Sequence, residues 1–106
     1  MRWVALAAMA FPENETRLDE AALALLLDAG AWRREGNAIT RTFTSKGFKG
    51  AVAFVNRIAE AANEANHHPD IHIENYRTVR IVLTTHATHG ISDADVELAR
   101  RIDELA

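Results

Sequence analysis

The stretch that decides the fold is residues 66–84, which read NHHPDIHIENYRTVRIVLT. Residues 78–84 carry an apolar side chain at every second position, with Val82 as the one apolar residue on the other face, which is the period expected of a β-strand that buries one face. On the apolar face lie Val79, Ile81 and Leu83. Pro69 prevents a helix from continuing and biases the residue before it towards extended backbone. We therefore expect a helix to end before Pro69 and residues 71–75 to lead into the strand.

Residues 48–66, immediately upstream, predict a long helix with two adjoining apolar stripes. The first stripe comprises Phe48, Val52, Val55, Ala59 and Ala62, and the second comprises Phe54, Ile58, Ala61 and Ala65. Two stripes imply burial over more than half of the circumference. We therefore expect one face to cover a sheet and the other to contact a partner helix or a second subunit. Gly47 is the predicted N-cap.

Two further helices and two short strands complete the pattern. Thr16 is the predicted N-cap of the first helix, with Asp19 at its third position, and Gly30 ends this helix. Residues 32–34 and 39–44 are typical of strands around a turn at 35–37. Ser92 opens the last helix. The order α-β-β-α-β-β-α indicates a single α+β domain, residues 1–106, with an antiparallel four-stranded sheet and helices packed on one face.

Composition excludes several classes of function. The chain has 106 residues, of which 48% are hydrophobic and 25% charged, as in ordinary soluble domains. A net charge of −3 without a basic stripe argues against nucleic-acid binding. The absence of cysteine excludes disulfides, thiolate nucleophiles and cysteine-ligated zinc. No apolar run approaches the roughly 20 residues of a membrane span, so we expect no membrane partner and a cytoplasmic location.

Residues 1–11 form the least informative part of the sequence. They combine one basic residue with a short apolar run, faintly like a secretory signal. The charged segment is minimal, so we prefer a short strand or a packed arm within an N-terminal extension of residues 1–15.

A cluster of titratable residues follows the long helix. All five histidines lie between His67 and His89, and histidine is the side chain whose pKa, about 6.5, suits proton transfer near neutral pH. We expect His67 and His68, at the helix end, to converge with His86, at a strand end. Three imidazoles and the carboxylate of Asp95 would then supply an acid, a base and a polar clamp.

Each of these residues also has a purely structural interpretation. His67 or His68 alone could interact with the carbonyls at a helix C-terminus, and His86 could be an exposed strand-end residue. Asp95 lies three residues after the helix-opening serine, the spacing of a capping box. The remaining histidines, His72 and His89, are expected to face solvent. A zinc site is a less favoured alternative because the helical H-E-x-x-H pattern is missing.

The histidines belong to a set of spaced motifs that extends along the chain. The motifs are Asn66-His67-His68-Pro69-Asp70-Ile71, Tyr76-x-x-Val79, Leu83-Thr84-Thr85-His86 and Gly90-Ile91-Ser92-x-x-Asp95, preceded by Thr16 and Trp32, by Ala38-Ile39-x-Arg41-x-Phe43 and by Phe48-x-x-Ala51-x-x-Phe54. In these motifs, over about residues 16–105, the chain resembles the pterin-4a-carbinolamine dehydratases. Residue identity and spacing agree together, which is more specific than a lone histidine pair.

The resemblance implies removal of water from 4a-hydroxytetrahydropterin to give quinonoid dihydropterin, with no metal and no redox cofactor. It implies that His67 and His86 act as acids on the hydroxyl, and that His68 binds the pterin or acts as base. Asp95 would orient His86 or hold the ring, and Pro69 and Tyr76 would contact substrate. The expected partners are a small-molecule pterin and further copies of this chain in a homodimer or homotetramer. A protein of the aromatic amino-acid hydroxylase pathway is a further possible partner.

This chain departs from the family pattern close to the predicted histidine site. The family often carries a glutamate one turn before the first histidine, where this chain has Asn63 with Glu64 beside it. If the missing carboxylate normally tunes a histidine, its replacement would lower activity, so one alternative function is a catalytically weak pterin-binding protein. The resemblance also implies a second alternative, a dimerising protein-interaction module, because members of the family also act as binding partners. A pure interaction protein would have no need to keep the three histidines and Asp95 together, which favours the enzyme.

Overall fold

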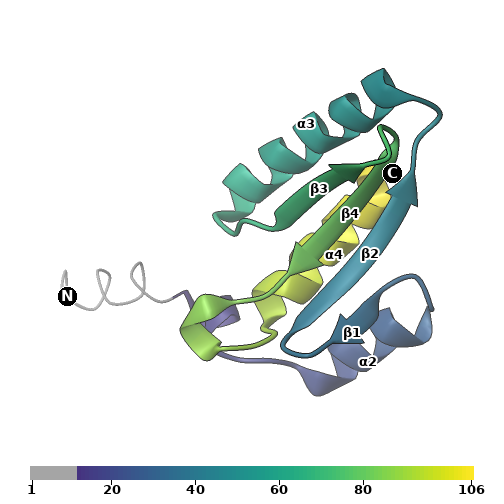
Figure 1. The fold of residues 1–106 in the computed structure, drawn as a ribbon. Coiled ribbons are helices and arrows are strands. Elements are labelled where there is room, and N and C mark those ends of the chain that lie inside the picture. Colours follow the sequence, from purple (N-terminus) through teal and green to yellow (C-terminus); the bar gives the residue numbers. More distant parts are fainter. Residues whose placement is uncertain (1–11) are drawn as a thin grey trace.

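The computed structural model describes residues 12–106, which form one four-stranded antiparallel sheet with helices on one of its faces (Figure 1). The strands are β1 (Arg33–Glu35), β2 (Ala38–Thr44), β3 (Asp70–Glu74) and β4 (Thr78–Leu83), and they lie in the order β1-β2-β4-β3. The helices are α2 (Glu20–Asp28), α3 (Phe48–Ala65) and α4 (Asp93–Leu105), with short 3-10 turns η1 (Glu13–Glu15) and η2 (His86–Thr88). The predicted order and the α+β class are confirmed. The arm predicted within residues 1–11 lies outside the described residues.

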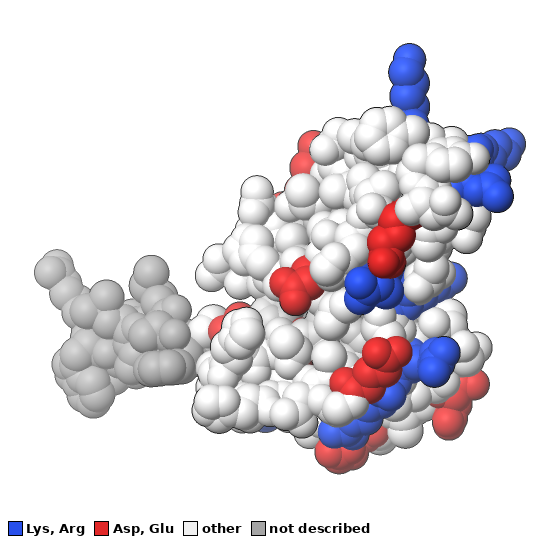
Figure 2. All heavy atoms as spheres, in the orientation of Figure 1, with Lys and Arg blue, Asp and Glu red and all other residues white. Residues whose placement is uncertain are grey.

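The core lies between the sheet and the helices. Val79, Ile81 and Leu83 of β4 are fully buried, as their alternation predicted. Antiparallel pairing sets Ile39 opposite Leu83 and Phe43 opposite Val79, so alternate residues of β2 and β4 contribute to the same apolar layer. The opposite face of the sheet is open, and Figure 2 shows acidic and basic side chains interspersed over it rather than segregated by sign.

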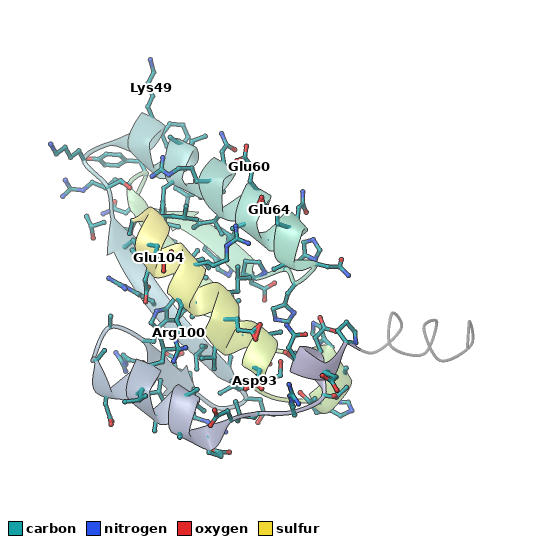
Figure 3. The ribbon with its side chains drawn as sticks, turned by 180° about the vertical axis from the view of Figure 1, so that it is seen from behind. Lys49, Glu60, Glu64, Asp93, Arg100 and Glu104 are labelled. Carbon is teal, nitrogen blue, oxygen red and sulfur yellow. The ribbon has the colours of Figure 1, made fainter. Side chains whose placement is uncertain are left out.

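The long helix α3 buries mainly its second apolar stripe. Phe54, Ile58 and Ala61 are buried, and α3 packs beside α4 as well as on β3 and β4 (Figure 3). The first stripe is only partly covered, since Phe48 is exposed and Val52 is half-buried. Burial by a second subunit therefore stays a prediction for this stripe.

Helix α2 begins three residues later than predicted. Its N-cap is Asp19, whose Oδ1 accepts hydrogen bonds from the amides of Ala21 (3.0 Å) and Ala22 (3.3 Å). The hydroxyl of Thr16 instead donates to the carbonyl of Glu13, which closes η1. Aspartate caps at least as well as threonine, and its charge favours the positive end of the helix dipole, so the later start is the more stable one.

Strand β1 also begins one residue later than the sequence indicated. Trp32 precedes the strand and is buried in the core, where its indole Nε1 donates to both carboxylate oxygens of Asp103 at 2.9 and 3.0 Å. Arg41 donates to the same carboxylate at 2.6 Å. The Arg41 side chain is thus partly buried at the edge of the core, with its guanidinium paired to Asp103.

The other predicted boundaries agree closely with the structure. Gly30 follows α2 with φ +89°, Gly47 is the N-cap of α3, and Ser92 and Asp95 form the capping box of α4. Among residues 12–106, no helix is both long enough and apolar enough to cross a membrane.

Candidate active site

Three segments that are distant in sequence meet at one end of the sheet. They are the C-terminal end of α3, the turn η2 after β4, and the turn η1 that precedes α2 (Figure 1). Helix α3 ends because Asn66 adopts the left-handed conformation, with φ 50°, and the amide of His67 bonds back to the carbonyl of Ala62. This Schellman-like ending turns the two following histidines away from the helix axis.

His67 is the buried member of the cluster. Its Nε2 lies 2.6 Å from Oδ1 of Asp95, and its Nδ1 lies 3.1 Å from Oε1 of Glu15. Only 8% of the His67 side chain is exposed. A neutral imidazole donates through one nitrogen only, so the doubly protonated imidazolium is the form that satisfies both carboxylates.

The carboxylate of Asp95 is fully buried beneath this imidazole. Its Oδ2 accepts from the hydroxyl of Thr85 at 2.7 Å and from the amide of Ser92 at 2.9 Å. Asp95 therefore caps α4, as its structural interpretation predicted, and contacts His67 at the same time. Its imidazole partner is His67 rather than His86, the one expected.

These contacts shift the proton affinity of His67. The hydrogen bond with Asp95 raises the pKa of His67 above its ordinary value of 6.5, while burial lowers it by a smaller amount. The charge of Asp95 and the contact with Glu15 raise the pKa further. His67 is thus an imidazole that its surroundings favour in the charged form.

The other two predicted histidines line an open cavity of about 270 Å³. Both His68 and His86 are exposed, and Nε2 of His68 lies 3.2 Å from Oδ1 of Asn63. The β4 ladder stops at Leu83, and His86 begins the turn η2. The cavity wall consists of Glu15, Asn66, His67, His68, Thr84, Thr85, His86 and Ala87.

The structure does not bring every predicted site residue to this cavity. Pro69 is half-buried between His68 and β3, and it is not among the residues of the cavity wall. Tyr76 is exposed in the β3–β4 hairpin, where Asn75 and Tyr76 both have positive φ. Five residues of extended strand, rising about 3.3 Å each, separate that turn from Pro69. In the single chain Tyr76 therefore lies at the opposite end of β3 from the histidines.

The remaining histidines, His72 and His89, are exposed, as predicted. A second cavity, of about 300 Å³, lies near the far end of β2 and contains Arg41 and Arg57 but no imidazole. In the described part of the chain, no three His, Asp or Glu side chains converge as ligands for one metal ion.

Sequence reasoning missed Glu15. This residue comes from the predicted N-terminal extension, and no motif or periodicity marks it. Its contact with His67 spans 52 positions of sequence. The only local signal was a carboxylate close to the start of the first helix, which is a common and uninformative position.

Comparison with known proteins identifies the family of this chain. Residues 16–105 match the family model described as Pterin 4 alpha carbinolamine dehydratase. A Thermomicrobium roseum protein named "Putative pterin-4-alpha-carbinolamine dehydratase" is 52% identical over 91 residues, covering 85% of this chain and 97% of its own length. A Nocardia farcinica protein with the same name is 48% identical over 93 residues, covering 88% and 97%.

Two solved structures share the fold. The transcriptional coactivator/pterin dehydratase from Brucella melitensis superposes with a TM-score of 0.75 at 32% identity, covering 85% of this chain and 98% of that one. A pterin dehydratase-like protein identified as a RuBisCO assembly factor in the alpha-carboxysome gives a TM-score of 0.60 at 29% identity, covering 72% and 89%. By sequence motif, family model and fold alike, this chain belongs to the pterin-4a-carbinolamine dehydratase family.

Proposed function

We propose that this protein is a dehydratase that eliminates water from 4a-hydroxytetrahydropterin to give quinonoid dihydropterin. The observation that carries the proposal is the histidine cavity, in which two exposed imidazoles, His68 and His86, adjoin a buried third, His67, held between carboxylates. Environments that push the proton affinities of neighbouring groups apart supply an acid and a base at one pH. An elimination that adds one proton and removes another requires this division.

The reaction needs a proton on the C4a hydroxyl, departure of water, and loss of the N5 proton as the C4a–N5 double bond forms. We assign protonation of the hydroxyl to His86, with the imidazolium of His67 as the second acid. Removal of the N5 proton, or binding of the ring, falls to His68. Asp95 positions His67, and Pro69 fixes the backbone between His68 and β3. Each proton transfer of this kind typically contributes about 10²–10⁴-fold.

The size of the cavity is compatible with a small bicyclic substrate. Its volume of about 270 Å³ lies near the lower limit of ligand pockets, which span about 300–1,000 Å³. The walls combine imidazole, hydroxyl and amide groups, which match the hydrogen-bonding edge of a pterin ring. In a cell, this reaction would regenerate the cofactor of aromatic amino-acid hydroxylases.

The test is the dehydration rate of freshly generated 4a-hydroxytetrahydropterin, followed through the absorbance of quinonoid dihydropterin. We expect wild type to accelerate the reaction and His86→Ala to lose about 10²–10⁴-fold of that acceleration. His72→Ala is the matched control, because His72 is an exposed imidazole outside the cavity wall. A folded wild type that does not accelerate dehydration, or equal losses in His86→Ala and His72→Ala, would refute the assignment.

The second candidate function is a catalytically weak pterin-binding protein or a dimerising protein-interaction module. Two observations favour it: Asn63 offers His68 a neutral amide where the family often has a carboxylate, and Phe48 is an exposed aromatic on the partly covered stripe of α3. Saturable pterin binding without turnover would support it. Sedimentation analysis of wild type and Phe48→Ser would show whether this stripe holds a homodimer or homotetramer together.

A further inference from the structure

We propose that Glu15 is a positioning residue of the histidine cavity, which clamps His67 against Asp95 and holds its imidazole in the charged form. The assignment rests on the contact between Oε1 of Glu15 and Nδ1 of His67, at 3.1 Å, opposite the 2.6 Å contact of Nε2 with Asp95. Glu15 precedes residues 16–105, which match the family model, so the clamp comes from a segment outside that match. This inference deepens the proposed function and rests on it.

The turn that carries Glu15 is fixed to the start of α4 by several independent contacts. Within the turn, the amide of Glu15 donates to the carbonyl of Pro12, and the side chain of Asn14 donates to Oε1 of Glu97 at 3.1 Å. Just after the turn, the carbonyl of Arg17 accepts from the amide of Asp93 at 2.9 Å. Figure 3 shows Asp93 at the end of α4 that adjoins this turn. The carboxylate of Glu15 is therefore presented by an anchored segment.

Asp93 strengthens this attachment from the α4 side. Its Oδ1 accepts from the amide of Asp19 at 2.7 Å, and its Oδ2 lies 3.6 Å from Nε of Arg17. The approach of η1 to α4 is thus determined by backbone and side-chain bonds that do not involve His67. These bonds place the turn η1 so that the side chain of Glu15 reaches the imidazole of His67.

The clamp has a chemical consequence for the cavity. Asp95 alone would be satisfied by a neutral imidazole that donates from Nε2, leaving a lone pair on Nδ1. Glu15 faces that second nitrogen and favours a proton there, so His67 offers positive charge and acidity instead of a base. The charged or titratable groups around His67 are Glu15 from η1, Asp95 from α4, His86 from η2 and the adjacent His68.

The contact between Glu15 and His67 is largely shielded from water, since the Glu15 side chain is 22% exposed and the His67 side chain is 8% exposed. An opposite charge within about 4–6 Å shifts a protonation midpoint by about 1–3 pH units when the site is well buried. Because Glu15 retains some contact with water, we expect its share of the pKa shift to be smaller than that of Asp95. A neutral glutamine keeps the shape and removes only the charge.

The experiment is an NMR pH titration of the His67 imidazole in wild type, Glu15→Gln and Glu13→Gln. Glu13 is the matched control, because it lies in the same turn and its 83%-exposed side chain faces Arg17 instead of His67. We expect Glu15→Gln to lower the titration midpoint of His67, and Glu13→Gln to leave it unchanged. In Glu15→Gln, the alkaline limb of the plot of dehydration rate against pH should move in the same direction as the His67 midpoint.

Together, the titration and the activity profile test the positioning role of Glu15 separately from the proposed dehydratase function. An unchanged His67 midpoint in Glu15→Gln, or an equal shift in Glu13→Gln, overturns the clamp whatever the activity is. If the His67 midpoint moves but the alkaline limb of the activity profile does not, the contact between Glu15 and His67 has no role in the reaction. A midpoint that moves in a protein without any dehydration activity supports the clamp and refutes the proposed function instead. Circular dichroism of Glu15→Gln, with Glu15→Asp as a second variant that keeps the charge, establishes that the fold is intact.

Discussion

The buried carboxylate of Asp95 provides the strongest test of how the site contributes to stability. Asp95→Asn keeps the size of the side chain but replaces one acceptor oxygen with an NH₂ donor. The remaining oxygen can still accept from the Ser92 amide and the Thr85 hydroxyl. The NH₂ group then faces Nε2 of His67, which must give up its proton, so the charged pair is lost.

The magnitude follows from the burial of both groups. Asp95 is fully buried and the His67 side chain is 8% exposed, so the pair is screened little by water. A hydrogen bond to a charged group contributes about 1.5–3 kcal/mol, and breaking a buried ion pair costs about 3–5 kcal/mol. Because the imidazole keeps its contact with Glu15, we expect Asp95→Asn to lose about 2–4 kcal/mol of unfolding free energy. That is a large fraction of the roughly 5–15 kcal/mol typical of a domain.

The unfolding free energy lost in Asp95→Asn should depend on pH, and the direction of this dependence follows from the pKa of His67. The folded-state pKa of His67 is raised above its unfolded value of about 6.5, so protonation stabilises the fold. This contribution is fully present below about pH 6.5 and disappears as pH rises through the folded pKa. Wild type should therefore lose stability over that window, whereas Asp95→Asn, which lacks the largest cause of the shift, should show a much flatter profile.

The assay is urea unfolding followed by far-ultraviolet circular dichroism at a series of pH values from 5.5 to about 9. Asp70→Asn is the control, since Asp70 is an exposed aspartate at the start of β3. A difference between wild type and Asp95→Asn that is the same at every pH would show that the carboxylate acts only as a helix cap. A difference below about 0.5 kcal/mol at pH 6 would refute the buried pair altogether.

Three further changes test other parts of the structure by urea unfolding. Thr85→Val removes a buried hydroxyl that donates to the fully buried carboxylate of Asp95, and we expect a loss of about 1–3 kcal/mol of unfolding free energy; no loss would mean that water replaces the hydroxyl. Asp103→Ala leaves the indole N–H of Trp32 without its acceptor, with an expected loss of about 1–2 kcal/mol, whereas the exposed neighbour Glu104 changed to alanine should lose little. Ile81→Ala creates a cavity in the fully buried centre of β4 and should cost about 2–5 kcal/mol; a smaller loss would indicate that the core collapses around the missing atoms.

Local sequence patterns were sufficient for most of the fold because they report local constraints. The alternation in β4 identified Val79, Ile81 and Leu83 as core residues, and Pro69 located the end of α3 to within a few positions. Where two residues compete for one local role, the pattern was ambiguous. Thr16 and Asp19 are both good N-caps, and the hydrogen bonds of η1 and of Asp93 decided in favour of Asp19.

The sequence by itself determined that His67, His68, His86 and Asp95 form a recognisable set, because residue type and spacing are written along the chain. Only the tertiary structure decided that Asp95 bonds His67, that Glu15 closes the other side of that imidazole, and that Tyr76 lies at the far end of β3. The two contacts of His67 span 28 and 52 positions. No local periodicity encodes pairings of that range, because they depend on how the whole sheet brings the ends of α3, α4 and η1 together.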